Sequence, residues 1–145
     1  MSRKIGALSV GVVMMMLAIN ISAQSSYIKT FSFEADAVEA LAIYKGSRET
    51  GYRGLQKLRA ADVKFNVTDR AVIKQLIEAV KFNKPISAKL AMIPHATVFI
   101  KFRDGSIKQA NLLNNYTYFD LIEDKLHTYP LTSGDLFDRY AQEVH

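Results

Sequence analysis

The segment 96–113 constrains the fold more than any other part of the chain, because it places two alternating apolar runs around a turn dipeptide. It reads ATVFIKFRDGSIKQANLL, with Asp104-Gly105 at the centre. An Asp-Gly pair between such runs is a strong signal for a β-hairpin, since both residues tolerate positive φ. A two-residue turn sets Lys101 opposite Lys108, and this like-charge pair opposes that register.

A second hairpin is predicted from the segments 116–122 and 125–131, which are joined by a short acidic turn. Short connections of this kind favour antiparallel neighbours. The expected register places five side chains on one exposed side: Tyr116, Tyr118, Asp120, His127 and Tyr129. In that register Asp120 lies opposite His127, and two of the tyrosines face each other.

Two amphipathic helices are predicted from apolar residues at helical spacing. The first begins at Thr68 as its N-cap, and its apolar face consists of Val72, Ile73, Leu76, Ile77 and Val80. The second closes the chain after Thr132 or Ser133, and its buried stripe consists of Leu136, Phe137, Tyr140, Ala141 and Val144. Each helix has one apolar side, so each must pack against another element.

Two earlier segments complete the expected fold. The segment 62–67 reads as a strand, whereas 37–45 is ambiguous, because its Ala and Glu residues favour a helix and Ile43-Tyr44 favours a strand. The sequence therefore predicts an α+β domain. It consists of a small antiparallel sheet of about five or six strands, with both amphipathic helices packed on one face.

The N-terminus has the order of a secretory signal peptide. Arg3 and Lys4 precede an apolar run over 5–19, and the small residues Ser22 and Ala23 follow. The run is shorter than the roughly 20 apolar residues that cross a bilayer. We expect residues 1–23 to be a cleaved signal peptide, with an uncleaved anchor as the alternative, and no membrane segment after cleavage.

Residues 24–145 are expected to form a single domain, because no repeat, low-complexity tract or proline-rich linker divides them. The whole chain has 19 basic and 14 acidic residues, and the leader holds two of the basic ones, so the mature net charge is +3. That charge is too small and too dispersed for a nucleic-acid partner. The absence of cysteine excludes disulfides and zinc–thiolate sites and favours a bacterial exported protein, periplasmic or secreted.

The stretch YKGSRETGYRG, residues 44–54, contains the glycine spacing of a phosphate-binding loop, at Gly46 and Gly51. Such a loop requires a lysine and then a serine or threonine after its second glycine. Tyr52 and Arg53 occupy those two positions here. Nucleotide binding is therefore excluded, and the stretch is expected to be a loop between elements.

Basic residues nevertheless gather around this loop: Lys45, Arg48, Arg53, Lys57, Arg59 and Lys64. Arginine and tyrosine suit an anionic glycan, a lipid headgroup or an acidic protein surface. An ordinary solvated loop is the alternative. The predicted binding residues are Tyr44, Arg48, Tyr52 and Arg53 in this region and Tyr116, Tyr118, His127 and Tyr129 in the second hairpin.

No catalytic, metal-binding or cofactor-binding residue is assigned. The three histidines are scattered, and neither Ser106 nor Ser133 lies in a nucleophile motif. The sequence predicts an exported, non-enzymatic module that binds a protein or an envelope component, as an inhibitor, immunity factor or accessory protein. One alternative is a small hydrolase or lyase of an envelope polymer that uses His127 with Asp120. Another is a structural subunit that assembles through an exposed edge strand.

Overall fold

The structure, a computed structural model, describes residues 33–46, 51–87, 94–124 and 127–144, with Tyr52 described by its backbone alone. The signal peptide predicted for residues 1–23 lies outside these ranges, and it stays a prediction.

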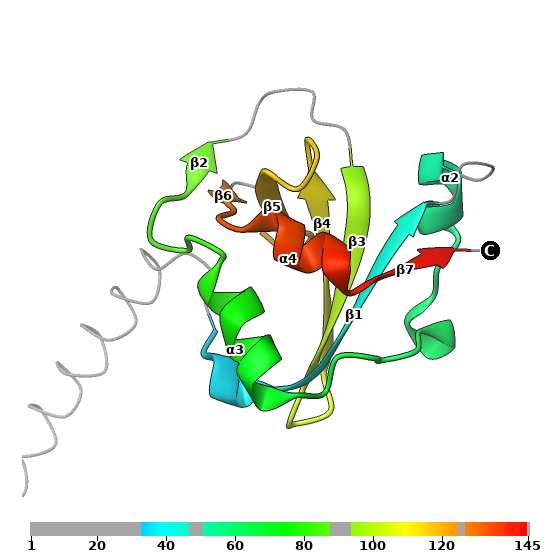
Figure 1. The fold of residues 1–145 in the computed structure, drawn as a ribbon, viewed down its shortest axis with the longest axis horizontal. Helices are drawn as coiled ribbons and strands as arrows, with labels where there is room; N and C mark the ends of the chain where they lie inside the picture. Colours follow the sequence, from blue (N-terminus) through cyan, green and yellow to red (C-terminus); the bar gives the residue numbers. More distant parts are fainter. Residues whose placement is uncertain (1–32, 47–50, 88–93, 125–126, 145) are drawn as a thin grey trace, which may run out of the picture. The chain divides into compact units, whose positions relative to one another are not determined.

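The described residues form one seven-stranded sheet in the order β2-β6-β5-β4-β3-β1-β7 (Figure 1). The strands are β1 (Val38–Gly46), β2 (Ile86–Ser87), β3 (Pro94–Phe102), β4 (Ile107–Leu113), β5 (Tyr118–Leu121), β6 (His127–Pro130) and β7 (Ala141–Val144). The helices are α2 (Gly51–Gln56), α3 (Arg70–Glu78) and α4 (Gly134–Arg139), with short 3-10 turns η1 (Ala35–Ala37) and η2 (Ala60–Asp62). The ambiguous segment before Gly46 is thus a strand, and 63–66 is extended without strand pairing.

The predicted fold class is wrong in strand number, strand direction and helix content. The sheet is mixed, because β7 runs parallel to β1 while the other pairs are antiparallel. Among the described residues only α3 is a helix of seven or more residues. The helices that correspond to the two predicted ones, α3 and α4, do pack on one face, whereas α2, which was not predicted, packs on the other.

The largest error concerns the C-terminal helix, which ends at Arg139. The chain then extends, and Ala141 pairs with Ile43 of β1 while Val144 pairs with Gly46. The residues 141–144 have no strong strand propensity of their own, so the pairing with β1 and the burial of Val144 decide their conformation. Tertiary contacts have overridden the helical spacing that the sequence shows.

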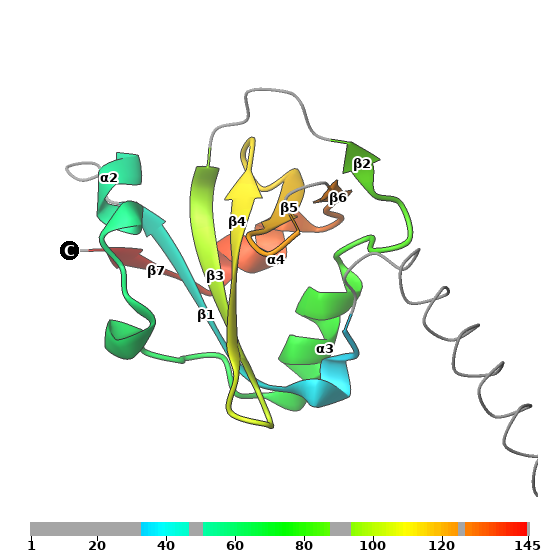
Figure 2. The ribbon, with the colours of Figure 1, turned by 180° about the vertical axis from the view of Figure 1, so that it is seen from behind.

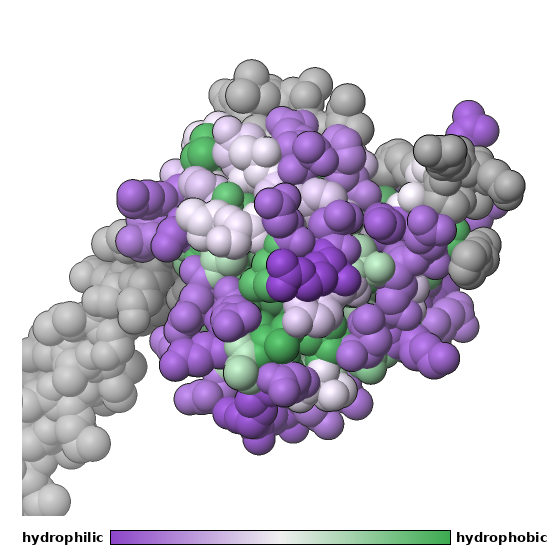
Figure 3. All heavy atoms as spheres, in the orientation of Figure 1, coloured by the Kyte–Doolittle hydropathy of each residue, from purple (hydrophilic) through white to green (hydrophobic). Residues whose placement is uncertain are grey.

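The first face of the sheet carries the main core, and α3 and α4 cover it (Figure 1). Asp69, rather than the predicted Thr68, caps α3, because its carboxylate accepts a hydrogen bond from the Val72 N–H at 3.1 Å. Ile73, Leu76 and Ile77 of α3 are buried against the sheet. Figure 3, which looks onto α3 and α4, shows hydrophobic residues around and between these helices, surrounded by larger areas of hydrophilic residues.

The second face of the sheet has a smaller apolar cluster. Its buried members are Ala42, Tyr44, Leu55, Phe99 and Val144, and Leu58, Val63 and Phe65 pack against them. Leu55 belongs to α2, so this cluster attaches α2 and the chain after it to β1 and β3. Figure 2 shows this segment beside β1 and β3, whereas no helix lies in front of β4.

Both predicted hairpins form, each one residue away from its expected register. In the first, Lys101 pairs with Ile107, because the turn is longer than two residues. The two lysines of the like-charge pair thus avoid each other, and Lys101 and Lys108 each contact a carboxylate instead. In the second hairpin Tyr118 pairs with Pro130 and Phe119 with Tyr129. A slip of one residue moves each side chain to the other face of a strand.

Candidate binding surface

The chain between β1 and α3 forms a compact surface segment, which we call the basic segment (residues 51–66). Leu55 is buried, and Leu58 and Phe65 pack against the same apolar cluster on the second face. Tyr44, 8% exposed, lies beneath the segment, and its hydroxyl accepts a hydrogen bond from the Lys64 N–H at 2.9 Å. The segment is therefore attached to the sheet by apolar contacts and by at least one hydrogen bond.

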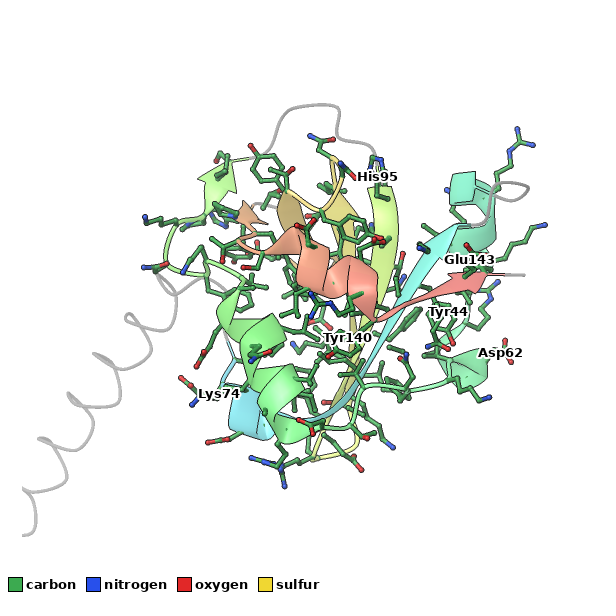
Figure 4. All side chains as sticks on the ribbon, in the orientation of Figure 1. Tyr44, Asp62, Lys74, His95, Tyr140 and Glu143 are labelled. Atoms are coloured by element: carbon green, nitrogen blue, oxygen red, sulfur yellow. The ribbon has the colours of Figure 1, made fainter. Side chains whose placement is uncertain are left out.

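The position of Tyr44 changes the role expected for it. Figure 4 shows Tyr44 and Asp62 on the α2 side of the sheet, and Lys74 of α3 on the other side. Because Tyr44 is buried, it supports the basic segment from below rather than offering its ring to a partner. Among the other predicted residues of this region, Arg53 is exposed on α2, Arg48 lies outside the described residues, and Tyr52 is placed only by its backbone.

The basic segment exposes four basic side chains and one acidic side chain. They are Arg53, Lys57, Arg59 and Lys64, with Asp62 as the acid. None of these four cations takes part in an ion pair within the part of the chain that the structure describes. Elsewhere basic residues do have carboxylate partners, as in the pairs Lys108–Glu123 at 2.7 Å and Arg70–Asp36 at 2.9 Å. Among the described residues, these four cations therefore have no carboxylate within ion-pair distance.

The second face continues past the basic segment onto β4 and β5, where we find an open half-face. Because Ala110, Leu112, Phe119 and Leu121 point into the main core, the alternating residues point to the second face. These residues are Ile107, Gln109, Asn111, Tyr118 and Asp120, with Ile122 just after β5. Ile107 and Ile122 are 38% and 42% exposed, and they are the large hydrophobic residues exposed within the described ranges.

The basic segment and the open half-face are continuous with each other. The ammonium group of Lys101 lies 5.9 Å from the centre of the Phe65 ring, which belongs to the basic segment. The Cα partner of Lys101 across the sheet is Ile107. The backbone N–H of Ile122 donates to the Gln109 carbonyl at 3.0 Å, next to Ile107 on the same strand. The sequence did not predict this surface, because the expected registers of the hairpins differ by one residue from the observed ones.

Asp120 is the acidic group of the open half-face. It is half-buried, and its Cα partner is Asn111, whose side-chain oxygen accepts a hydrogen bond from the Thr97 hydroxyl at 3.2 Å. Burial, and secondarily the charge of Asp124, raises the pKa of the Asp120 carboxyl above its ordinary value. The open half-face therefore has an acidic side chain at Asp120, and basic side chains lie where it meets the basic segment.

The register of β5 and β6 separates the residues of the predicted hairpin site. Tyr129 is fully buried in the core of the first face, and Tyr118 lies on the second face. The expected alignment of Asp120 with His127 is wrong. Tyr118 pairs with Pro130 and Phe119 pairs with Tyr129, so the two strands are shifted by one residue from the expected register. The pairing of Asp120 with His127, on which the alternative hydrolase or lyase depended, is thus not formed by this hairpin.

The partner of His127 is Asp124, which the sequence showed only as one acid of a turn. The His127 Nδ1 lies 3.4 Å from an Asp124 carboxylate oxygen, and the Tyr129 hydroxyl donates to the other oxygen at 2.5 Å. Asp124 is only 5% exposed, so these contacts compensate for the burial of its charge. The spacing of three residues between Asp124 and His127 is visible in the sequence, but no prediction used it.

Tyr116, the remaining predicted residue, lies in a turn of unusual backbone conformation. Asn114, Asn115 and Tyr116 all have positive φ, between 48° and 63°. The Tyr116 hydroxyl donates to the Asp138 carboxylate at 3.0 Å, and Lys45 contacts the same carboxylate at 3.6 Å. Burial, and then the hydrogen bond to Asp138, raises the pKa of Tyr116 well above its ordinary value. These contacts hold the turn against α4.

Metal-binding clusters and membrane-spanning helices are absent from the described ranges. No group of three or more His, Cys, Asp or Glu residues there is arranged to hold a metal ion. Within the same ranges no helix is long and apolar enough to span a bilayer. No protein-family model, no curated protein and no solved structure matches this chain at a significant level.

Proposed function

We propose that this chain is a small exported module without catalytic activity that binds a protein or an envelope component carrying negative charge. The observation that carries the proposal is the group of four exposed basic side chains on the basic segment, which have no ion-pair partner among the described residues. Opposite charges on a partner would supply the missing neutralisation, and the arginines can bind carboxylates or phosphates in a bidentate manner. The export part of the proposal rests on the leader sequence.

The attachment of the segment also favours a binding role. An isolated charged loop loses conformational entropy when a partner orders it, which weakens binding. Leu55, Leu58 and Phe65 hold the basic segment on the sheet, so this cost is reduced. An inhibitor, an immunity factor and an envelope accessory protein would all use such a surface.

The test is a cross-linked pull-down of the protein expressed with its own leader in a bacterial envelope, followed by mass spectrometry. We expect the double variant Arg53→Glu/Lys57→Glu to lose most of the captured partner, because it reverses the charge of two side chains on the basic segment. The matched control is Lys81→Glu/Lys84→Glu, which makes the same change of charge just before β2, at the opposite edge of the sheet from β7. Capture by the control should equal that of the unmodified protein.

The proposal also predicts a dependence on salt, because exposed charges are screened within about 10 Å at 0.1 M ionic strength. Equal capture by all three proteins, or capture that does not change with salt, would move the interface away from the basic segment. Thermal unfolding of each variant checks that the substitutions leave the fold intact, since Arg53, Lys57 and Lys84 are exposed and Lys81 is half-buried.

A further inference from the structure

We infer that the anionic partner is an acidic polypeptide, whose carboxylates face the basic segment while its apolar side chains cover the open half-face. This inference rests on the proposed function and adds the chemical class of the partner. It depends on two features that lie next to each other: the unpaired cations of residues 51–66 and the exposed Ile107 and Ile122.

The first step is the shared location of both features. Leu58 and Phe65 pack on the second face around Phe99 of β3, and Phe99 pairs with Gln109 of β4. Ile107 lies two positions from Gln109 on the same side of β4, so the apolar residues begin where the basic segment ends. A partner that lies across β3 and β4 therefore meets both features at once.

The second step is the choice among anionic partners. A sulfated or carboxylated glycan would neutralise the cations, but it offers little apolar surface to cover two isoleucines. An anionic bilayer is entered by apolar side chains that are set among basic ones. Here the exposed isoleucines lie outside residues 51–66, and they share the second face with the carboxyl of Asp120 and the amide side chains of β4. A polypeptide supplies carboxylates and apolar side chains on one surface, and it can pair with amide side chains such as Gln109 and Asn111.

The third step is the orientation that the charges select. Lys101 lies where the basic segment meets the sheet, with its ammonium group near Phe65. Asp120 lies farther across the half-face on β5. Carboxylates of a partner are thus attracted toward residues 51–66 and repelled near Asp120, so the partner's apolar residues are placed over Ile107 and Ile122.

Defined polymers test the inference with the unmodified, full-length protein. The probes are poly-L-glutamate, a random copolymer of glutamate and tyrosine, dextran sulfate, and vesicles containing phosphatidylglycerol. We expect the copolymer to bind about five- to tenfold more tightly than poly-L-glutamate at equal charge, because it covers the two isoleucines. Ile107→Ser/Ile122→Ser should remove this difference while leaving the affinity for poly-L-glutamate unchanged, which also shows that the variant is folded.

Two outcomes separate the failure of this inference from the failure of the proposed function. The polypeptide inference is overturned by any of three results, each of which leaves the basic segment as the binding surface. The copolymer could bind no more tightly than poly-L-glutamate, or Ile107→Ser/Ile122→Ser could keep the tighter binding of the copolymer. Alternatively, dextran sulfate or the vesicles could bind more tightly than the copolymer. If Arg53→Glu/Lys57→Glu binds every probe as the unmodified protein does, the proposed function itself fails. The proposed function and the polypeptide inference are both supported if Arg53→Glu/Lys57→Glu loses binding to all the anionic probes and the unmodified protein binds the copolymer more tightly than poly-L-glutamate.

Discussion

The two faces of the sheet are built in different ways. The first face is closed by α3 and α4 over a core that extends across the strands from β1 to β6. The second face is closed only over β1, β3 and β7, by a smaller cluster under the basic segment, and it is open over β4 and β5. The first face therefore holds the domain together, whereas the second face displays the unpaired cations and the exposed isoleucines. The residues that hold the domain together and the exposed charged and apolar residues thus lie on opposite sides of the same strands.

The largest expected effect compares one buried leucine from each face. Leu76→Ala, in α3, should lower the free energy of unfolding by about 3 to 4 kcal/mol, because the fully buried site leaves a cavity. Leu55→Ala, in α2, should cost about 2 kcal/mol, since the smaller cluster can collapse around the gap. Urea denaturation of both variants measures the difference.

Binding measurements on the same two variants give a second comparison of the faces. Leu55→Ala should weaken binding to poly-L-glutamate, because the basic segment loses its attachment, while folded Leu76→Ala should bind with unchanged affinity. A loss of unfolding free energy in Leu55→Ala that equals the loss in Leu76→Ala would show that the two faces stabilise the domain equally.

A smaller effect is expected at Gly134, which begins α4 on the first face. An added Cβ would lie 2.4 Å from the Tyr116 carbonyl oxygen, so Gly134→Ala must displace either the turn or the helix. We expect a loss of about 2 kcal/mol in unfolding free energy. The control is Gly105→Ala in open space at φ +90°, where the backbone conformation alone should cost about 1 kcal/mol.

Thermal or urea unfolding distinguishes these two glycine variants. Equal losses at both positions would mean that α4 and the turn at Tyr116 are not tightly packed, and that the first face is less closed than its burial indicates. A larger loss at Gly134 together with unchanged binding to poly-L-glutamate would support the separation of the faces.

The smallest effect concerns Asp120 on the open half-face. Because burial raises its pKa in the folded protein, the folded state holds a proton that the unfolded state releases, between the ordinary pKa near 3.8 and the raised value. Stability contributed by this group therefore falls as pH rises through that window. Asp120→Asn should be more stable than the unmodified protein above the window and should lose this dependence.

Unfolding free energies measured across the acidic range check this expectation, with Asp104→Asn as a control of opposite sign. Hydrogen bonds from Ser106 lower the pKa of Asp104, so its contribution is present above its ordinary pKa and is lost as pH falls. A stability profile of Asp120→Asn that parallels the unmodified protein would indicate that the half-face around Asp120 is fully solvated.

The sequence predicted those elements whose determinants are local. Asp104-Gly105 produced a hairpin, and the apolar spacing from Val72 onward produced α3, because turn chemistry and helical periodicity act within a few residues. The basic residues of the candidate surface were likewise visible in the sequence, since charge needs no register to be recognised.

The errors share one physical cause, which is that the deciding contacts are distant in the sequence. Residues 141–144 form β7 only because β1 offers an unpaired edge. The registers of both hairpins differ by one residue from the expected ones, and this moved Ile107 to the exposed face and Tyr129 into the core. No local pattern distinguishes two registers that differ by one residue, so the open half-face was not predicted.

The parallel pairing of β7 with β1 has a consequence for the order in which the chain folds. The two strands are about 100 residues apart in the sequence, and closing such a long loop is slow compared with forming a local hairpin. Until residues 141–144 reach it, the outer edge of β1 has no other strand beside it in the described sheet, and it is open to wrong pairing. Completion of the sheet is therefore a slow, non-local step of folding.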